Sequence, residues 1–236
     1  MESRLILEVS TPDALTAGVA CGASALLAPN AAWGAELRRL VRARGVKAEI
    51  FVAITAAGGE APNVELDADL DVLGMDLPDG VFLADCRSRA DLQQVAVKLA
   101  LREALAGRPD GVVRIVAMAA QSPAGVLALS GLAGGARRLA GLAFDPGGLA
   151  DATRIDLTAP ALALAEAQVV FAAAAAGVQA IFVPPRQEET TRKGEAERLL
   201  ERCAQARRAG YGGMVVKTPA QFVALRERLA MIDKRP

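Results

Sequence analysis

The feature that most constrains the fold is the alternation of short apolar runs with longer segments of helical period. Eight apolar runs follow one another along the chain: Leu5–Val9, Ala25–Ala28, Glu49–Ile54, Val81–Ala84, Val112–Met118, Gly141–Phe144, Ala180–Val183 and Gly213–Val216. Continuous apolar runs of this length are typical of parallel strands that are buried on both faces. Eight such strands, each followed by a helix, predict a closed α/β barrel.

Helical segments and glycines fill the intervals between these runs. The clearest helical segments are Ala35–Arg44, Asp91–Ala106, Ala161–Ala176, Glu189–Ala209 and Pro219–Ala230. Gly22, Gly177 and Gly210 each stand between a helical segment and the next strand, where a left-handed residue often ends a helix. No linker divides the chain, so residues 1–236 are expected to form a single (β/α)₈ TIM barrel. The alternative is an open doubly wound sheet, which the count of eight runs and the lack of a glycine-rich turn after the first strand disfavour.

The composition excludes several functional classes. The 27 basic and 27 acidic residues cancel, and one Trp and one Tyr offer little for base stacking, so nucleic-acid binding is not expected. The most apolar stretch, Ala159–Pro185, is interrupted by polar residues and is read as a helix and a strand rather than a membrane span. Three widely spaced cysteines and no signal sequence at the N-terminus indicate a cytoplasmic protein.

The chain contains no histidine. This removes the commonest general base, the commonest zinc ligand and every nucleophile that depends on a histidine partner. Carboxylates, lysine, cysteine, arginine and a bound metal ion remain as sources of chemistry.

In a barrel of this type, the chemistry lies at the carboxyl ends of the strands. The polar residues predicted there are Glu8, Ser10, Asn30, Thr55, Asp85, Cys86, Arg87, Gln121, Ser122, Asp145, Arg186, Lys217 and Thr218.

Several motifs at these positions resemble the citrate lyase β-subunit and HpcH/HpaI 2-oxo acid aldolase family. The opening residues 4–10, the turn at 78–83 and the ending at 210–221 are similar to that family over nearly the whole chain. Gln121-Ser122-Pro123-Ala124-Gly125-Val126 resembles its strand-five motif Glu-Thr-Ala-Arg-Gly-Val. Residues 142–149, which include Asp145, resemble its strand-six motif Phe-Gly-x-x-Asp-Leu.

The resemblance implies a carbon–carbon lyase that acts on a 2-oxo acid or an acyl thioester through an enolate, with Mg²⁺ held by carboxylates from strands five and six. This chain departs from that pattern at the metal site. The strand-five Glu corresponds to Gln121, the strand-six Asp to Gly148, and an assisting strand-three Arg to Ala53. The Pro-Lys pair after strand four becomes Ala84-Asp85.

Each candidate residue has a structural alternative. Asp85 and Asp145 are predicted as catalytic residues and as ligands of a relocated Mg²⁺ site. The alternative is that Asp145 is only part of a turn with Pro146 and Gly147, and that Asp85 only caps the helix from Arg87 onward. Lys217 is a candidate catalytic lysine that could form a Schiff base, or else a solvated or anion-binding lysine. Cys86 has no evident cation partner and is expected to be inert.

The substrate-binding candidates are Gln121, Ser122 and Arg186. Arg186 could hold a carboxylate or phosphate in a bidentate grip, or lie in a surface loop. Gln121 and Ser122 could hydrogen-bond a ligand or only the loop backbone.

Two functional hypotheses follow. The first is a divergent aldolase-type lyase that binds a small-molecule carboxylate or acyl-CoA. The second is a non-catalytic barrel that binds a ligand or a partner protein. The resemblance also implies a homo-oligomer, a trimer or hexamer, in which Phe222, Leu225 and Leu229 pack either on their own barrel or on a neighbour.

Overall fold

The computed structural model describes residues 4–55, 64–185 and 195–232. Eight strands form one closed barrel in chain order, every neighbouring pair is parallel, and β1 pairs with β8 to close it. The strands are β1 (Arg4–Glu8), β2 (Ala25–Ala28), β3 (Glu49–Thr55), β4 (Gly80–Ala84), β5 (Arg114–Ala117), β6 (Leu139–Phe144), β7 (Gln179–Phe182) and β8 (Gly213–Val216). The predicted barrel is confirmed, and the open doubly wound alternative is wrong because a sheet of that kind has two free edges.

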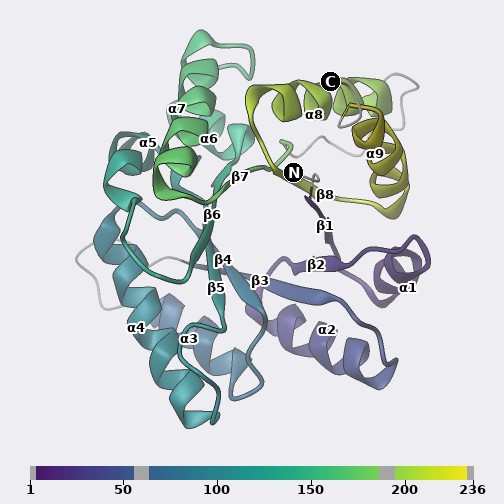
Figure 1. The fold of residues 1–236 in the computed structure, drawn as a ribbon, viewed down its shortest axis with the longest axis vertical. Coiled ribbons are helices and arrows are strands. Elements are labelled where there is room, and N and C mark those ends of the chain that lie inside the picture. Colours follow the sequence, from purple (N-terminus) through teal and green to yellow (C-terminus); the bar gives the residue numbers. More distant parts are fainter. Residues whose placement is uncertain (1–3, 56–63, 186–194, 233–236) are drawn as a thin grey trace.

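Helices surround the strands on the outside of the barrel (Figure 1). They are α1 (Pro12–Ala20), α2 (Ala31–Ala43), α3 (Val64–Leu73), α4 (Arg89–Leu105), α5 (Pro123–Ala128), α6 (Pro146–Thr153), α7 (Pro160–Ala176), α8 (Glu195–Ala209) and α9 (Pro219–Ile232), with short 3-10 turns η1 (Ala119–Gln121) and η2 (Leu129–Leu132). No helix in the described part of the chain is long and apolar enough to cross a membrane.

Two apolar layers stabilise this arrangement. Residues from successive strands, among them Ile6, Phe51, Phe82, Ile181 and Val215, form a small cluster of their own that fills the barrel interior. A larger cluster joins the outward faces of the strands to the helices around them. Filling the interior in this way makes the barrel a packed core and leaves its two ends as the places where polar groups gather.

Charged residues occupy the amino-terminal end of the barrel. Arg4 and Arg114 lie over the ring of Phe51, with their guanidinium carbons 5.1 and 5.2 Å from its centroid, and both form ion pairs with Glu49. This cluster covers the amino-terminal end of the packed interior.

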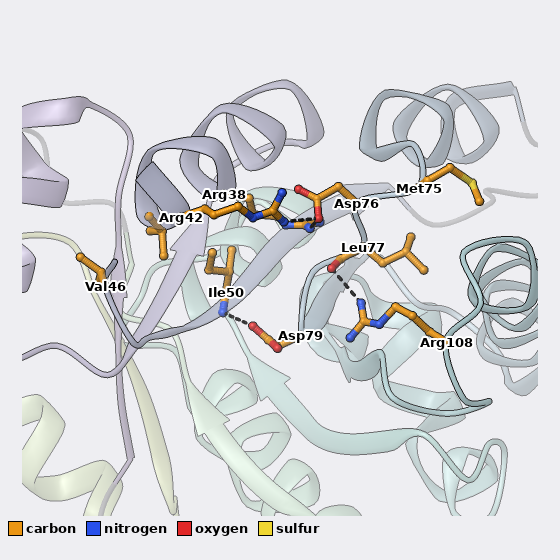
Figure 2. A pocket seen from close by; sticks show the side chains of 10 residues that line it. Arg38, Arg42, Val46, Ile50, Met75, Asp76, Leu77, Asp79 and Arg108 are labelled. Carbon is orange, nitrogen blue, oxygen red and sulfur yellow. Dashed lines mark hydrogen bonds and ion pairs between the residues drawn. The ribbon is translucent and has the colours of Figure 1, made fainter. Parts of the chain in front are cut away.

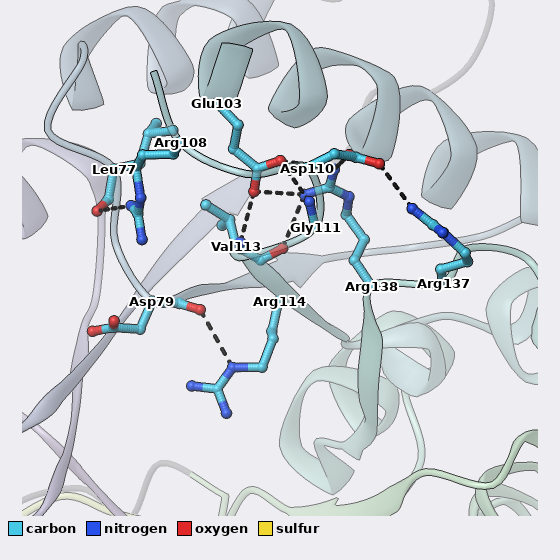
Figure 3. A network of polar contacts seen from close by, with 10 residues as sticks. All are labelled: Leu77, Asp79, Glu103, Arg108, Asp110, Gly111, Val113, Arg114, Arg137 and Arg138. Carbon is cyan, nitrogen blue, oxygen red and sulfur yellow. Dashed lines mark hydrogen bonds and ion pairs between the residues drawn. The ribbon is translucent and has the colours of Figure 1, made fainter. Parts of the chain in front are cut away.

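A buried ion-pair network joins the end of α4 to the start of β6 (Figure 3). Glu103 is fully buried, and its two carboxylate oxygens accept hydrogen bonds from Arg138 at 2.9 and 3.0 Å. The same carboxylate accepts hydrogen bonds from the backbone N–H groups of Gly111 and Val113, and Arg138 also forms an ion pair with Asp110. The network therefore ties the α4–β5 loop to its neighbouring strand.

The C-terminal helix packs on its own barrel. Phe222, Leu225 and Leu229 of α9 are buried, and the helix contacts α8, β1 and β8 of the same chain. Of the two alternatives left open by the sequence, the intramolecular one holds, so these three side chains are not free to bind a neighbouring copy.

Candidate functional site

Gln121 is the centre of the polar cluster at the carboxyl ends of the strands. Its side-chain oxygen accepts a hydrogen bond from the backbone N–H of Asp85 at 2.8 Å, and its amide nitrogen donates to Asp145 Oδ2 at 3.1 Å. One side chain therefore joins the ends of β4, β5 and β6. The sequence placed all three residues at strand ends, and the structure brings them together.

Gly125 explains how Gln121 is held in place. A Cβ atom at Gly125 would lie 1.8 Å from the backbone oxygen of Ala119 and 3.3 Å from that of Cys86. Only glycine lets α5 pack this closely against η1, the turn that carries Gln121. The position was part of the strand-five motif, but its role depends on a backbone contact that the sequence does not display.

Asp145 combines a capping role with a place at the site. It is the N-cap of α6, and its Oδ1 accepts a hydrogen bond from the backbone N–H of Gly148 at 3.1 Å, so its local structural role is that of a helix cap, where the sequence had suggested a turn. Its Oδ2 lies 3.0 Å from the point where a Cβ at Gly148 would stand. The carboxylate of Asp145 therefore occupies the space into which a side chain at position 148 would extend.

Asp85 is held in an unusual backbone conformation. Its φ is 50°, in the left-handed region that non-glycine residues rarely adopt, and its carboxylate pairs with Arg87. Its Oδ1 is buried and has no hydrogen-bond partner within the described part of the chain. The suggestion that Asp85 caps the following helix is wrong, because Ser88 caps α4 by accepting the N–H of Asp91.

A cleft of about 760 Å³ opens beside this cluster. It is lined by Gln121, Asp145, Gly147, Gly148, Ala150, Asp151, residues 155–158 and Pro185. Its charged lining residues are Asp145, Asp151 and Asp156, all carboxylates. The cleft is large enough for a small organic molecule and carries negative charge on its described walls.

Lys217 forms an ion pair with Glu8 across the junction of β8 and β1. The side chains are 30% and 21% exposed, respectively, so both reach solvent at the mouth of the barrel. The sequence predicted Lys217 at a strand end but gave no sign of its partner, because 209 residues separate the two in the chain. A lysine that attacks a carbonyl would first have to leave this ion pair.

The remaining candidate residues are Ser122, Arg186 and Cys86. Ser122 is the N-cap of α5, where its hydroxyl accepts the N–H of Gly125 at 3.3 Å. Arg186 lies outside the described residues. Burial, followed by the charge of Asp91, raises the pKa of the Cys86 thiol to about 12, in agreement with its expected inertness.

The cluster fits a magnesium ion poorly. Gln121 directs its NH₂ group, a donor, toward Asp145, and both oxygens of that carboxylate already accept hydrogen bonds. Among the residues that the structure describes, no group of three or more His, Cys, Asp or Glu side chains could hold a metal ion. A ready-made site for a hard cation needs several converging oxygen ligands, so the relocated site of Asp85 and Asp145 stays a prediction.

These features define the class: a closed (β/α)₈ barrel with a polar cluster and a cleft at the end that barrel enzymes use for catalysis. Solved structures with this fold include the citrate lyase β-subunit from M. tuberculosis complexed with oxaloacetate and magnesium, at 17% identity, TM-score 0.69 and 97% coverage of both chains.

Two further structures share the fold. An HpcH/HpaI aldolase/citrate lyase family protein from Burkholderia cenocepacia J2315 is 18% identical, with TM-score 0.67 and coverage of 100% of this chain and 95% of that one. Haloferax volcanii malate synthase, in a magnesium/glyoxylate complex, is 17% identical, with TM-score 0.75 and coverage of 100% and 76%.

The structural neighbours thus include the family that the sequence motifs resemble. At these identities the likeness shows the shared fold. Neither a protein-family profile nor a curated protein matches the sequence.

Proposed function

We propose that this chain is a carbon–carbon lyase of the aldolase type that acts on a small 2-oxo acid or acyl thioester through an enolate. The observation that carries the proposal is the contact between Gln121 and Asp145 at the wall of the cleft. These side chains come from the ends of the same two strands that hold the metal-binding carboxylates in the family that the sequence resembles. Asp145 occupies the space into which a side chain at position 148 would extend. A carboxylate that follows strand six is therefore still present at the site, but it belongs to residue 145 and not to residue 148.

The charges at the barrel mouth suggest how such a reaction proceeds. The ammonium group of Lys217 supplies positive charge for a substrate carboxylate or for the oxygen of an enolate. In the proposed reaction Glu8, which lies against that ammonium group, accepts a proton from the substrate. Gln121 is fixed at both ends of its amide and orients Asp145 at the wall of the cleft.

A non-catalytic binding role is the second candidate. The observation in its favour is that the side chains of the cluster satisfy one another: Gln121 uses both ends of its amide, Asp145 caps a helix, and Asp85 pairs with Arg87. Such a network can hold a loop in place without taking part in a reaction.

Removal of either charge at the mouth separates the two candidates. Lys217→Met and Glu8→Gln should each reduce the exchange of pyruvate methyl protons for deuterium by at least about 100-fold, the typical contribution of a positioned acid or base. Lys98→Met is the matched control, because Lys98 forms a similar ion pair with Asp67 on the outer helices. Exchange by the Lys217 and Glu8 variants at the control's rate would contradict the roles proposed here.

A further inference from the structure

A second cleft lies at the opposite end of the barrel, among the loops that lead into the strands (Figure 2). It has a volume of about 400 Å³ and is bounded by α2, the start of β3, the loop between α3 and β4, and Arg108 in the loop after α4. None of the candidate site residues at the carboxyl ends lines it. Any ligand here would therefore bind independently of the function proposed above.

Three arginines and two aspartates line this cleft: Arg38, Arg42, Arg108, Asp76 and Asp79. Asp76 pairs with both Arg38 and Arg42. Asp79 accepts the backbone N–H of Ile50 at 2.8 Å, and Arg108 donates to the backbone oxygen of Leu77 at 2.9 Å. The lining of the cleft thus has one net positive charge, and the carboxylate of Asp76 is shared by two guanidinium groups.

Arg38 shows where negative charge is lacking. Its side chain is only 7% exposed, and its Nη1 is buried without a hydrogen-bond partner among the described residues. Burial lowers the pKa of Arg38; Asp76 opposes this shift, while the charges of Arg42 and Arg108 add to it. A buried guanidinium group with an unused donor beside two other cations is a site that an oxyanion would stabilise.

From this geometry we infer that the cleft between α2 and the α3–β4 loop binds a small organic oxyanion, with its anionic group between Arg38, Arg42 and Arg108. The bidentate geometry of guanidinium groups suits the oxygens of a phosphate or carboxylate.

The rest of the lining indicates what the ligand carries besides its charge. Val41, Val46, Ile50, Met75 and Leu77 also line the cleft, and Met75 is 52% exposed. Val41, Ile50 and Leu77 are already buried, so an apolar group attached to the anion would cover mainly Met75 and the half-buried Val46. The preferred ligand is therefore a monoester or acid with a short apolar body rather than a bare inorganic ion.

Calorimetric titration of the full chain with phenyl phosphate and with inorganic phosphate, at constant ionic strength, tests the inference. Phenyl phosphate should bind saturably and more tightly than inorganic phosphate. Arg42→Gln and Arg108→Gln should each weaken its binding by about tenfold, the loss expected for one charge-assisted contact. Arg39→Gln is the matched control, because Arg39 lies on the same helix, pairs with Glu36 and does not line the cleft.

Asp76→Asn gives a test in the opposite direction. Asp76 is the internal anion with which a ligand must compete, so its neutralisation should tighten phenyl phosphate binding and enlarge the rise in melting temperature that the ligand causes. A purely structural ion pair would give a less stable variant that phenyl phosphate does not stabilise. Absence of saturable binding by the wild type would contradict the proposed site, and so would an equal loss of affinity in the Arg39 control and the two arginine variants. Equal affinity for phenyl phosphate and inorganic phosphate would contradict the preference for a ligand with an apolar body.

Discussion

At the scale of single residues, Gln121 places a neutral amide at the centre of the polar cluster. Its amide joins Asp85 to Asp145 where the resembled family has a glutamate, and a neutral amide cannot replace the charge of a carboxylate beside a metal ion. The neighbouring carboxylate of Asp145 is nevertheless present. Glutamine differs from glutamate only in the amide nitrogen that replaces one carboxylate oxygen, so the single substitution Gln121→Glu would turn this cluster into a pair of carboxylates.

Gln121→Glu should create a site for a divalent cation. Without metal, the new carboxylate would lose the hydrogen bond to Asp145 and repel it, so the variant should melt below the wild type. Mg²⁺ at 100 times its dissociation constant should restore about 2.7 kcal/mol, roughly 5 to 10 °C in melting temperature. Differential scanning fluorimetry with Mg²⁺ measures this, with Gln121→Met as the control. A rise in the wild type equal to that of the variant would show that Gln121 does not exclude the metal.

The buried pair of Glu103 and Arg138 should control part of the pH dependence of stability. Burial alone would raise the pKa of Glu103, but the hydrogen bonds from Arg138, Val113 and Gly111 outweigh it and lower the pKa below its usual value. A carboxyl group whose pKa is lower in the folded state stabilises the fold above its unfolded pKa, about 4.3, and loses that contribution as the pH falls through the folded value.

Glu103→Gln should therefore cost about 3 kcal/mol in the free energy of unfolding at pH 7, because it leaves the charge of Arg138 buried with less compensation. The difference from the wild type should shrink at pH 3. Urea denaturation at both pH values measures it, and Arg137→Gln, whose side chain is 89% exposed, should change little. A difference that is the same at pH 7 and pH 3 would contradict this role.

At the scale of elements, α4 has an apolar stripe on its outer face. Val97, Leu101 and Leu105 follow at intervals of four residues and are all exposed, while Leu92, Val95 and Leu99 of the same helix are buried. Exposed apolar side chains that recur along one face of a helix are a candidate interaction surface. Since the apolar residues of α9 are buried in their own barrel, we expect α4 to contribute to the predicted homo-oligomer.

Leu101→Lys should convert the oligomer into a monomer, because a charge in the centre of the stripe would be buried at the interface. Sedimentation velocity at micromolar concentration measures the change, and Leu164→Lys on α7 serves as a comparison at an exposed leucine of another helix. A wild type that sediments as a single monomeric species would refute the expectation.

The elements also show how far the sequence alone could predict the structure. Periodicity located all eight strands, because each is a continuous apolar run buried on both faces. It missed α3, α5 and α6 as separate helices: α5 and α6 are short, and α3 is rich in acidic residues that blur its apolar period. The contacts within the site, such as those of Lys217 with Glu8 and of Gly125 with Ala119, join residues whose approach depends on the closed barrel, so no local pattern predicts them.

At the scale of the whole molecule, the two ends of the barrel differ. The carboxyl ends hold Gln121, Asp145, Lys217 and an acidic cleft, and the amino-terminal end holds clustered arginines and a second, smaller cleft. A packed interior separates them. Under the two proposals made above, the reaction takes place at one end and the small anion binds at the other.

The most direct test of the proposed lyase function is the exchange of pyruvate methyl protons for deuterium, followed by proton NMR, with Mg²⁺ and then with EDTA. The proposal predicts exchange that persists in EDTA, because Lys217 and Glu8 supply the charge and the base; borohydride trapping would then show whether Lys217 acts through a Schiff base. Exchange that depends on Mg²⁺ would contradict the metal-free roles and favour a site at Asp85 and Asp145. No exchange under either condition would contradict enolate formation from this 2-oxo acid and favour the non-catalytic barrel.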